Sequence, residues 1–473
     1  MTQAIILILA FAVAGALLNL FARWERTGKE HYAVFFLVAM VVAESTLYEN
    51  QDNMPRDIFH PGSGAFEFRL PEVIITLALM ARLAIRGKPR WIGMPALLWT
   101  AFGVWYTVAL VEGLLNHNDA TQIPYEAKAI IYVVGGYALA AGVPAQRYLE
   151  GRGFERLVRW SGVAAAVVVG MTIVHKQYDI HLPLLPLPDF GVDGSDAATI
   201  FAAIGLIGLL MELAKPKRST RTLVAVVPLL FSPFLTHQRA VLVMLGASVT
   251  VLLLVALGPT ARRRLRVTAA QVLLTFLAVV GVVLAVSVIP AAESQGALQL
   301  PLKSTLVPTF ESTGKLESEA DRANKWEVSW GIIRQHPIIG SGLGVEFTFF
   351  NPGPNTFVTT DINENIALDL LLRAGVIGLL LFVLPFVISV VDGIGAWRHH
   401  PDRMAAVLAL ALVAVVVGFV SKGMVESIFE KYRLATMLGI WLGMLRSVVT
   451  SAHRSWRQTA RPYAYGEVSA RSG

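Results

Sequence analysis

An arginine in a very short polar connection is one of the residues of this chain that could do chemistry. Arg239 follows Thr236, His237 and Gln238 and lies between two apolar segments. A connection this short leaves its polar residues at the rim of a helix bundle, where an ionisable group is costly unless it is paired or used. The alternative for Arg239 is that its long side chain reaches the lipid headgroups. His237 has no second histidine or carboxylate at metal-binding spacing, so we do not expect it to be a ligand.

A second arginine, Arg322, lies on a predicted amphipathic helix at 318–336. Trp326, Trp330 and Ile333 share one face with this arginine at helical spacing and form a predicted apolar stripe. Indole rings are favoured at the membrane–water interface, so we expect this helix to lie along the outer membrane surface. Arg322 would then lie at the depth of the lipid phosphates.

The ends of this helix also carry sequence signals. Ser318 with Asp321 three residues later predicts an N-terminal cap, and Pro337 predicts the end of the helix. The alternative to a role at the membrane is that Arg322 pairs with its helical neighbours Glu319 or Asp321 on a solvated face.

The glycine-rich segment Gly340-Ser-Gly342-Leu-Gly344 follows this helix. A dinucleotide-binding loop would follow a strand and open a helix, and this segment does neither, so the nucleotide interpretation fails. We expect a tight turn, with contact between its backbone amides and a phosphate as the alternative.

The composition indicates which elements must position these residues. Of the 473 residues, 55% are hydrophobic and 15% are charged. This is enough apolar sequence for about thirteen helices of about 20 residues across a hydrocarbon layer about 30 Å thick. The absence of cysteine excludes disulfides, thiolate metal sites and cysteine nucleophiles, so any chemistry must use oxygen and nitrogen groups. The net charge of +7 resides mainly in short loops, as in membrane proteins, and does not indicate nucleic-acid binding.

The predicted fold is therefore an all-α, polytopic transmembrane bundle of 12 or 13 spans with one large extracytoplasmic loop. The predicted spans are 4–22, 31–47, 71–86, 92–112, 126–144, 157–174, 197–213, 222–236, 240–257, 268–290, 366–391, 404–420 and 432–449. The chain divides into the first ten spans at 1–290, the loop at 291–365 with its amphipathic helix, the last three spans at 366–449 and a disordered cytoplasmic tail at 450–473.

Charge gives the orientation. If the N-terminus is outside, every cluster of basic residues falls on one side of the membrane, which must be the cytoplasmic side. These clusters lie at 86–90, 147–159, 215–221, 262–266, 398–403 and 454–461. Connections on the other side, such as 48–69 and 175–196, are acidic or mixed. The long segment 291–365 faces outward, and ordered loops of this length are usually functional.

Two runs of residues lie in and just after the long loop. They are the run from Arg322 and Trp326 through Ile332-Ile333-Arg-Gln-His336-Pro337-Ile-Ile-Gly340-Ser-Gly342-Leu-Gly344, and the run Asn365-Ile-Ala-Leu368-Asp-Leu-Leu371-Leu-Arg-Ala-Gly375-Val-Ile-Gly378. Together with the short connection at Arg239, these motifs from about 236 to 378 resemble the bacterial O-antigen ligase and O-antigen polymerase superfamily. The resemblance implies about twelve transmembrane helices and a large periplasmic loop in a bacterial inner (cytoplasmic) membrane protein of cell-envelope polysaccharide biosynthesis. It also implies a glycosyltransferase that takes a glycan from a polyprenyl-diphosphate carrier, such as undecaprenyl diphosphate, without metal ion, cofactor or nucleotide sugar.

The resemblance further assigns roles to residues. The two essential arginines of the family match Arg239 and Arg322, which would be catalytic and would bind the donor diphosphate through bidentate hydrogen bonds. The family carries His-Asn before the helix that follows the loop, whereas this chain has Glu364-Asn365. A carboxylate can also act as general base for an acceptor hydroxyl, so Glu364 is the predicted base. Alternatively, Glu364 caps the helix that starts near 366.

A transporter or flippase of lipid-linked glycans is the competing function. Transporters bury ionisable residues near the middle of the membrane. Here Glu44, Arg239, Arg322, Glu364 and Lys422 all lie at the predicted outer ends of spans, which favours chemistry at the outer face. Ligase and polymerase use the same donor and differ in the acceptor, which is a glycan, lipid or protein hydroxyl, so the sequence leaves both open.

Overall fold

The computed structural model describes residues 2–47, 69–87, 93–150, 152–178, 195–234, 239–256, 313–352, 355–361, 363–426 and 431–469. The helices before the long loop are α1 (Thr2–Arg26), α2 (His31–Leu47), α3 (Leu70–Arg86), α4 (Met94–Leu115), α5 (Gln122–Ala141), α6 (Ala145–Leu149), α7 (Gly153–Tyr178), α8 (Ser195–Ala214), α9 (Thr220–Phe231), the 3-10 helix η2 (Ser232–Phe234) and α10 (Arg239–Ala256). The loop contributes α14 (Thr313–Gln335), β1 (Phe347–Asn351) and β2 (Thr356–Thr360), and the chain continues with α15 (Ile366–His399), α16 (Arg403–Gly423) and α17 (Tyr432–Ser469).

The predicted all-α polytopic fold is confirmed. Twelve of the thirteen predicted spans coincide with helices, and the thirteenth, 268–290, lies outside the described residues. Within the described part of the chain, α4, α8, α15, α16 and α17 are long and apolar enough to cross a membrane, and α2, α9 and α10 contain shorter apolar segments. Long apolar runs form helices here because a helix satisfies all its interior backbone groups without water.

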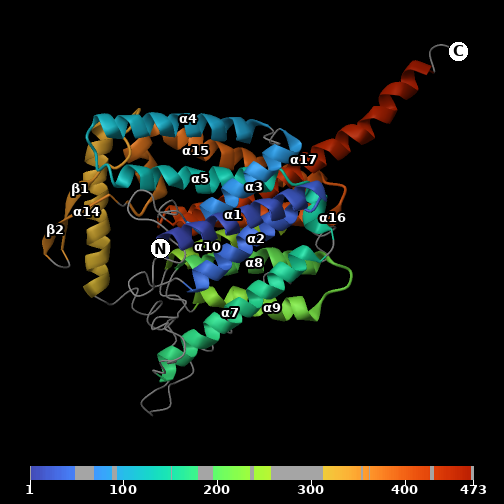
Figure 1. Cartoon of the computed structure of the whole chain (residues 1–473), viewed down its shortest axis with the longest axis horizontal. Coiled ribbons are helices and arrows are strands. Elements are labelled where there is room, and N and C mark those ends of the chain that lie inside the picture. The colour runs from blue at the N-terminus through green and yellow to red at the C-terminus, as the bar shows by residue number, and fades with distance from the viewer. Residues whose placement is uncertain are drawn as a thin grey trace.

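The bundle has two distinct ends, which Figure 1 shows. We call the end covered by α14, β1 and β2 the hairpin end, and the opposite end, beyond which the last part of α17 projects, the tail end. The tail predicted to be disordered from 450 onward is helical as far as Ser469, and no glycine or proline interrupts residues 450–461. Helix propagation therefore continues past the predicted end of the last span.

The helix of the loop, α14, differs from its prediction in two ways. It starts at Thr313 rather than at Ser318, so the predicted cap is wrong, although it ends at Gln335 just before Pro337 as expected. The predicted stripe is also divided: Ile333 is buried, whereas Trp326 and Trp330 remain 38% and 43% exposed.

The division follows from the direction in which α14 packs. Its buried face runs through Lys325, Ser329 and Ile333, so Trp326 and Trp330 lie on the flank of that face. Figure 1 shows α14 lying across the end of the bundle. The contact between α14 and lipid stays a prediction.

The loop also contains a β-hairpin that the all-α prediction missed. Strands β1 and β2 pair antiparallel, from Phe347 opposite Thr360 to Asn351 opposite Thr356. Phe347 and Phe349 point into a small core formed with α14 and α15, while Phe350 and Phe357 lie outside, with ring centroids 5.5 Å apart. The side chains of β1 thus alternate between core and exterior as a half-buried strand requires.

Three glycines attach the loop to the bundle. Gly340, Gly342 and Gly344 have φ angles of 87°, 85° and 71°, in the left-handed region that favours glycine. Every backbone amide of 340–344 donates to a protein acceptor; the acceptors are the carbonyls of His336, Leu372, Arg373 and Ala109 and the carboxylate of Glu126. The predicted tight turn is confirmed, and these amides have no hydrogen atom left for a phosphate.

Candidate functional site

Two of the predicted site residues, Arg322 of α14 and Glu364, meet at the hairpin end. The Nε of Arg322 donates to Oε2 of Glu364 across a sequence separation of 42 residues. Lys325 adds its Nζ at 3.7 Å from the other oxygen, Oε1. We call Arg322, Lys325 and Glu364 the arginine–glutamate site. It combines a guanidinium group that can bind an anion with a carboxylate that can accept a proton.

The backbone on both sides of Glu364 is anchored. Asn363 is fully buried, and its Nδ2 donates to Oγ of Ser329 at 3.1 Å. Asn365 is the N-cap of α15, since its side chain accepts from the amides of Ala367 and Leu368. The alternative in which Glu364 caps this helix is therefore wrong, because Asn365 performs that role and Glu364 is directed to the cations of α14.

Arg239 is the first residue of α10, and its side chain lies outside the described part of the structure. Its backbone can be placed from its neighbours. Thr222 of α9 and Met404 of α16 line one cavity, so both helices begin at the same end and finish at the other. Only the four residues 235–238 separate the end of η2 from α10, and four residues span at most about 14 Å.

The end at which α9 and α16 finish is the hairpin end. Nδ2 of Asn365 donates to the carbonyl of Met424, just beyond α16, at 3.0 Å. α10 packs along α16, with Gly418 next to Met244 and Ser248. The structure thus brings Arg322 and Glu364 together and places the backbone of Arg239 at the same end of the bundle.

Lys325 was missed by the sequence analysis. A signal existed, because Lys325 follows Arg322 by three residues and so lies near the same helix face. Its burial was not visible in the sequence, since it depends on Phe349 of the unpredicted hairpin, whose ring centroid lies 5.1 Å from Nζ.

A second arginine cluster at this end is buried. Arg373 contacts Oδ2 of Asp369 at 2.5 Å and Oε1 of Glu126 at 3.0 Å, and it donates to the carbonyl of Asp361 at 2.7 Å. The other oxygen of Glu126 accepts from the amide of Gly344 at 2.8 Å. This cluster joins α5, α15 and the glycine turn, and its geometry is that of a structural connection.

A third group of charges surrounds the end of α16. The buried Lys422 contacts Glu426 at 2.6 Å, and Lys431 contacts Glu426 and, at 3.4 Å, Asp196. Burial alone would raise the pKa of Glu426, but the ammonium groups of Lys422 and Lys431 outweigh burial and lower this pKa to about 2. Glu426 is therefore an ionised partner of two lysines close to Met424, which contacts Asn365.

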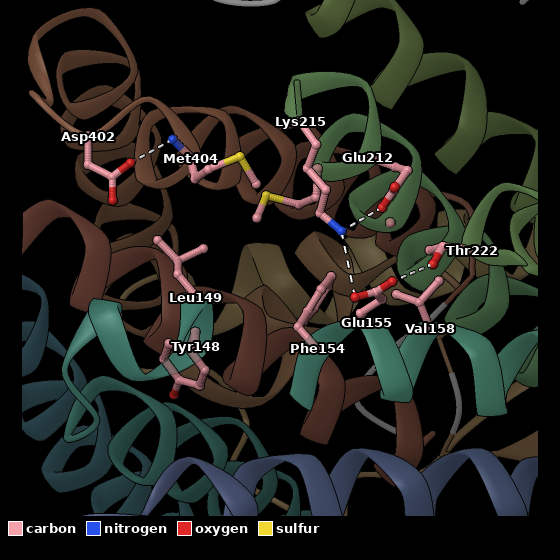
Figure 2. A pocket seen from close by; sticks show the side chains of 12 residues that line it. Tyr148, Leu149, Phe154, Glu155, Val158, Glu212, Lys215, Thr222, Asp402 and Met404 are labelled. Carbon is pink, nitrogen blue, oxygen red and sulfur yellow. Dashed lines mark hydrogen bonds and ion pairs between the residues drawn. The ribbon is translucent and has the colours of Figure 1, made fainter. Parts of the chain in front are cut away.

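A cavity of about 300 Å³ lies at the tail end, and Figure 2 shows the side chains that line it. Lys215 lies 2.7 Å from Glu212 and 3.9 Å from Glu155, and the hydroxyl of Thr222 donates to Glu155 at 3.1 Å. These groups are paired with one another, and the cavity contains none of the predicted site residues. Among the residues that the structure describes, no cluster of His, Asp or Glu side chains has the arrangement of a metal site.

One family of known proteins matches the part of the chain that contains this arrangement. Residues 224–383 match the family model of the O-antigen ligases. Over this segment the chain is similar to the O-antigen ligases. The matched segment is about a third of the chain and contains Arg239, Arg322 and Glu364, so the superfamily domain and the candidate site coincide. The resemblance inferred from the motifs is thereby confirmed, and a multi-pass membrane protein of O-antigen ligase type follows. No curated protein matches the chain.

Proposed function

We propose that this protein is an inverting, metal-independent membrane glycosyltransferase of the O-antigen ligase and polymerase type. It transfers a glycan from a polyprenyl-diphosphate carrier to an acceptor hydroxyl at the outer face of the bacterial cytoplasmic membrane. The observation that carries the proposal is the ion pair between Arg322 and Glu364, because it places an anion-binding group next to a group that can accept a proton.

In the proposed reaction the acceptor hydroxyl attacks the anomeric carbon of the donor glycan. A new carbon–oxygen bond forms there, and the bond from the anomeric carbon to the diphosphate breaks, with its electron pair leaving on the diphosphate oxygen. Glu364 takes the hydroxyl proton. Arg322 and Arg239 stabilise the negative charge that grows on the leaving diphosphate, since guanidinium groups bind phosphate oxygens in a bidentate manner.

The accessibility of the site supports this assignment. Side chains of Arg322 and Glu364 are 43% and 30% exposed, so a donor headgroup can reach both of them. Membrane lipids would surround the polyprenyl chain of the donor, and no cofactor is required for the proposed steps.

The distribution of basic residues supports an external hairpin end. Arg86 pairs with Glu25 and Glu30 where α1 and α3 finish, and Lys215 lies in the cavity at the tail end. Basic residues mark the cytoplasmic side, which supports a cytoplasmic tail end and an arginine–glutamate site at the outer face of the membrane.

The test uses the purified protein in lipid nanodiscs with an undecaprenyl-diphosphate-linked oligosaccharide and candidate acceptors. Transfer with stoichiometric release of undecaprenyl diphosphate, and inversion at the new glycosidic bond by NMR, is the expected result. Movement of the donor across a proteoliposome membrane without bond cleavage would instead establish the flippase function.

Mass spectrometry of surface glycans from a strain that lacks the gene separates the two superfamily activities. Short, unpolymerised units in the mutant identify a polymerase. Full-length chains that remain unattached identify a ligase.

A further inference from the structure

The two oxygens of Glu364 are held by two different cations. Oε2 accepts from Nε of Arg322, and Oε1 lies 3.7 Å from Nζ of Lys325. A carboxylate oxygen that accepts from a guanidinium group is blocked, because the guanidinium occupies the position that an acceptor hydroxyl would take. In this arrangement the proposed base is covered on its Oε2 side.

The two cations differ in how firmly they are held. The side chain of Arg322 is 43% exposed, whereas that of Lys325 is 9% exposed. The ammonium group of Lys325 also lies over the ring of Phe349, which is buried in the core between α14, β1 and α15. Arg322 can therefore turn toward an incoming anion, and Lys325 remains in place.

The carboxylate itself has a fixed attachment. Asn363 is tied to Ser329 of α14, and Asn365 is tied both to the first turn of α15 and to Met424. Glu364 lies between these anchored residues. When Arg322 leaves, Lys325 is the group that decides where the freed carboxylate points.

We propose that Lys325 is a positioning residue that holds Glu364 through Oε1 while the donor diphosphate draws Arg322 away from Oε2. This inference rests on the proposed function, since it takes the ligand of Arg322 to be a polyprenyl diphosphate. Donor binding then uncovers the oxygen that accepts the acceptor proton. The donor must therefore bind before the acceptor hydroxyl is activated.

The first test is kinetic and uses the full chain in nanodiscs. Lys325→Met should lower kcat by roughly tenfold to a hundredfold, since a misplaced catalytic group costs about that much. The KM for the donor should stay within about twofold of the wild-type value, and Lys325→Arg should restore most of the lost kcat. Arg334→Met is the matched control, because it removes an exposed positive charge from the same helix and should leave both constants unchanged.

Each other kinetic outcome contradicts the proposal. Unchanged kcat in Lys325→Met shows that Lys325 has no positioning role. A large rise in donor KM makes Lys325 a ligand of the donor. An equal loss in Lys325→Arg, with normal thermal stability in both variants, shows that a cation at this position is not what matters.

The second test needs no transfer activity and no variant that must fold. Carbodiimide labelling of Glu364 in the wild-type protein, followed by peptide mass spectrometry, is measured with and without undecaprenyl diphosphate. Labelling should rise severalfold with the diphosphate, as Arg322 leaves Oε2. Unchanged labelling at saturating diphosphate would overturn the proposed exchange, in which Arg322 leaves Glu364 and binds the diphosphate. If labelling rises but no transfer is found with any acceptor, the exchange stands and the proposed function fails.

Discussion

Two arginine clusters lie at the hairpin end. Both pair arginine with carboxylates, but one is structural and the other is the candidate functional site. Arg373 is 4% exposed and contacts Asp369, Glu126 and the carbonyl of Asp361. Arg322 is 43% exposed and contacts Glu364. Both arginines pair with carboxylates, so the residue types alone do not distinguish them. Accessibility does, because a ligand can approach Arg322 without opening the protein.

A substitution in a buried arginine–carboxylate cluster should therefore have a different effect from one in an exposed pair. Loss of one partner from a buried cluster leaves uncompensated charges without water. Loss of one partner from an exposed pair leaves a group that water can solvate, so the fold survives and only the chemistry changes. Stability and transfer activity should therefore respond to different substitutions.

The largest expected effect is on stability. Arg373→Ala should lower the free energy of unfolding by about 3–5 kcal/mol, because Asp369 and Glu126 would remain buried without their cation. Thermal unfolding in detergent followed by fluorescence measures this change. Wild-type stability in this variant would show that the buried cluster is dispensable and would remove the basis of the comparison.

Arg322→Ala should abolish transfer while the protein stays folded and inserted. Loss of a charged donor to the leaving group costs about 3–4 kcal/mol of transition-state stabilisation. Arg322→Lys should rescue poorly, because an ammonium group cannot form the bidentate pair. The same results are expected for Arg239→Ala and Arg239→Lys, measured by transfer in nanodiscs. An arginine whose alanine variant turns over normally is a lipid anchor instead.

Glu364→Gln should lower kcat roughly a hundredfold, because the amide keeps the shape but cannot accept a proton. Donor binding, measured with radiolabelled undecaprenyl diphosphate, should persist. Loss of the neighbouring cap is a separate effect, since Asn365→Ala should cost about 1 kcal/mol of stability. Full activity in Glu364→Gln would move the base elsewhere, with Asp361, Glu346, Glu44 and His237 as the next candidates.

A smaller effect concerns pH. Because the pKa of Glu426 is lowered to about 2, its pairing with Lys422 and Lys431 stabilises the folded state above the ordinary glutamate pKa and is lost as the pH falls toward 2. Glu426→Gln should therefore lower the thermal midpoint at pH 7, and the difference from wild type should shrink progressively below about pH 4.5. A difference that is constant from pH 7 to pH 3 would show that charge at this position contributes nothing.

The last prediction tests which end of the bundle faces the outside of the cell. It uses substitutions that should change neither stability nor activity. The chain has no cysteine, so Phe357→Cys on the hairpin and His453→Cys near the tail end can each be labelled alone. An impermeant maleimide should label residue 357 in intact cells and residue 453 only after the membrane is opened. The reverse pattern would place the arginine–glutamate site in the cytoplasm.

The bundle helices were predictable from the sequence, because long apolar runs between polar breaks have one stable conformation in a membrane. Arg322 and Glu364 were also recognisable individually from their motifs. Their direct pairing was not, since it joins residues 42 apart through the packing of α14 on α15. The alternative that Glu364 caps α15 named the wrong neighbour, because either residue type can cap a helix and only the backbone conformation shows that Asn365 is the cap.

The hairpin and Lys325 show a different limit. The segment Phe347–Asn351 has a strand pattern, but five residues are too few to outweigh the helical character of the chain. Unless β1 is predicted, Phe349 cannot be placed next to Lys325, and the burial of Lys325 cannot be inferred. The contacts within the site therefore depend on the tertiary packing of the loop, whereas the segments that contain the site were recognisable from local sequence.

The glycine turn has a consequence for mutational scanning. A Cβ atom at Gly342 would lie 2.2 Å from the backbone nitrogen of Gly113, and one at Gly113 would lie 2.2 Å from the carbonyl oxygen of Leu343. These two backbones touch directly, so even alanine at either position forces them apart. In a scan for activity, both positions should be as intolerant as Arg322, although neither has a side chain. Measuring protein abundance alongside activity separates these steric positions from the chemical ones, since only the steric positions lose both together.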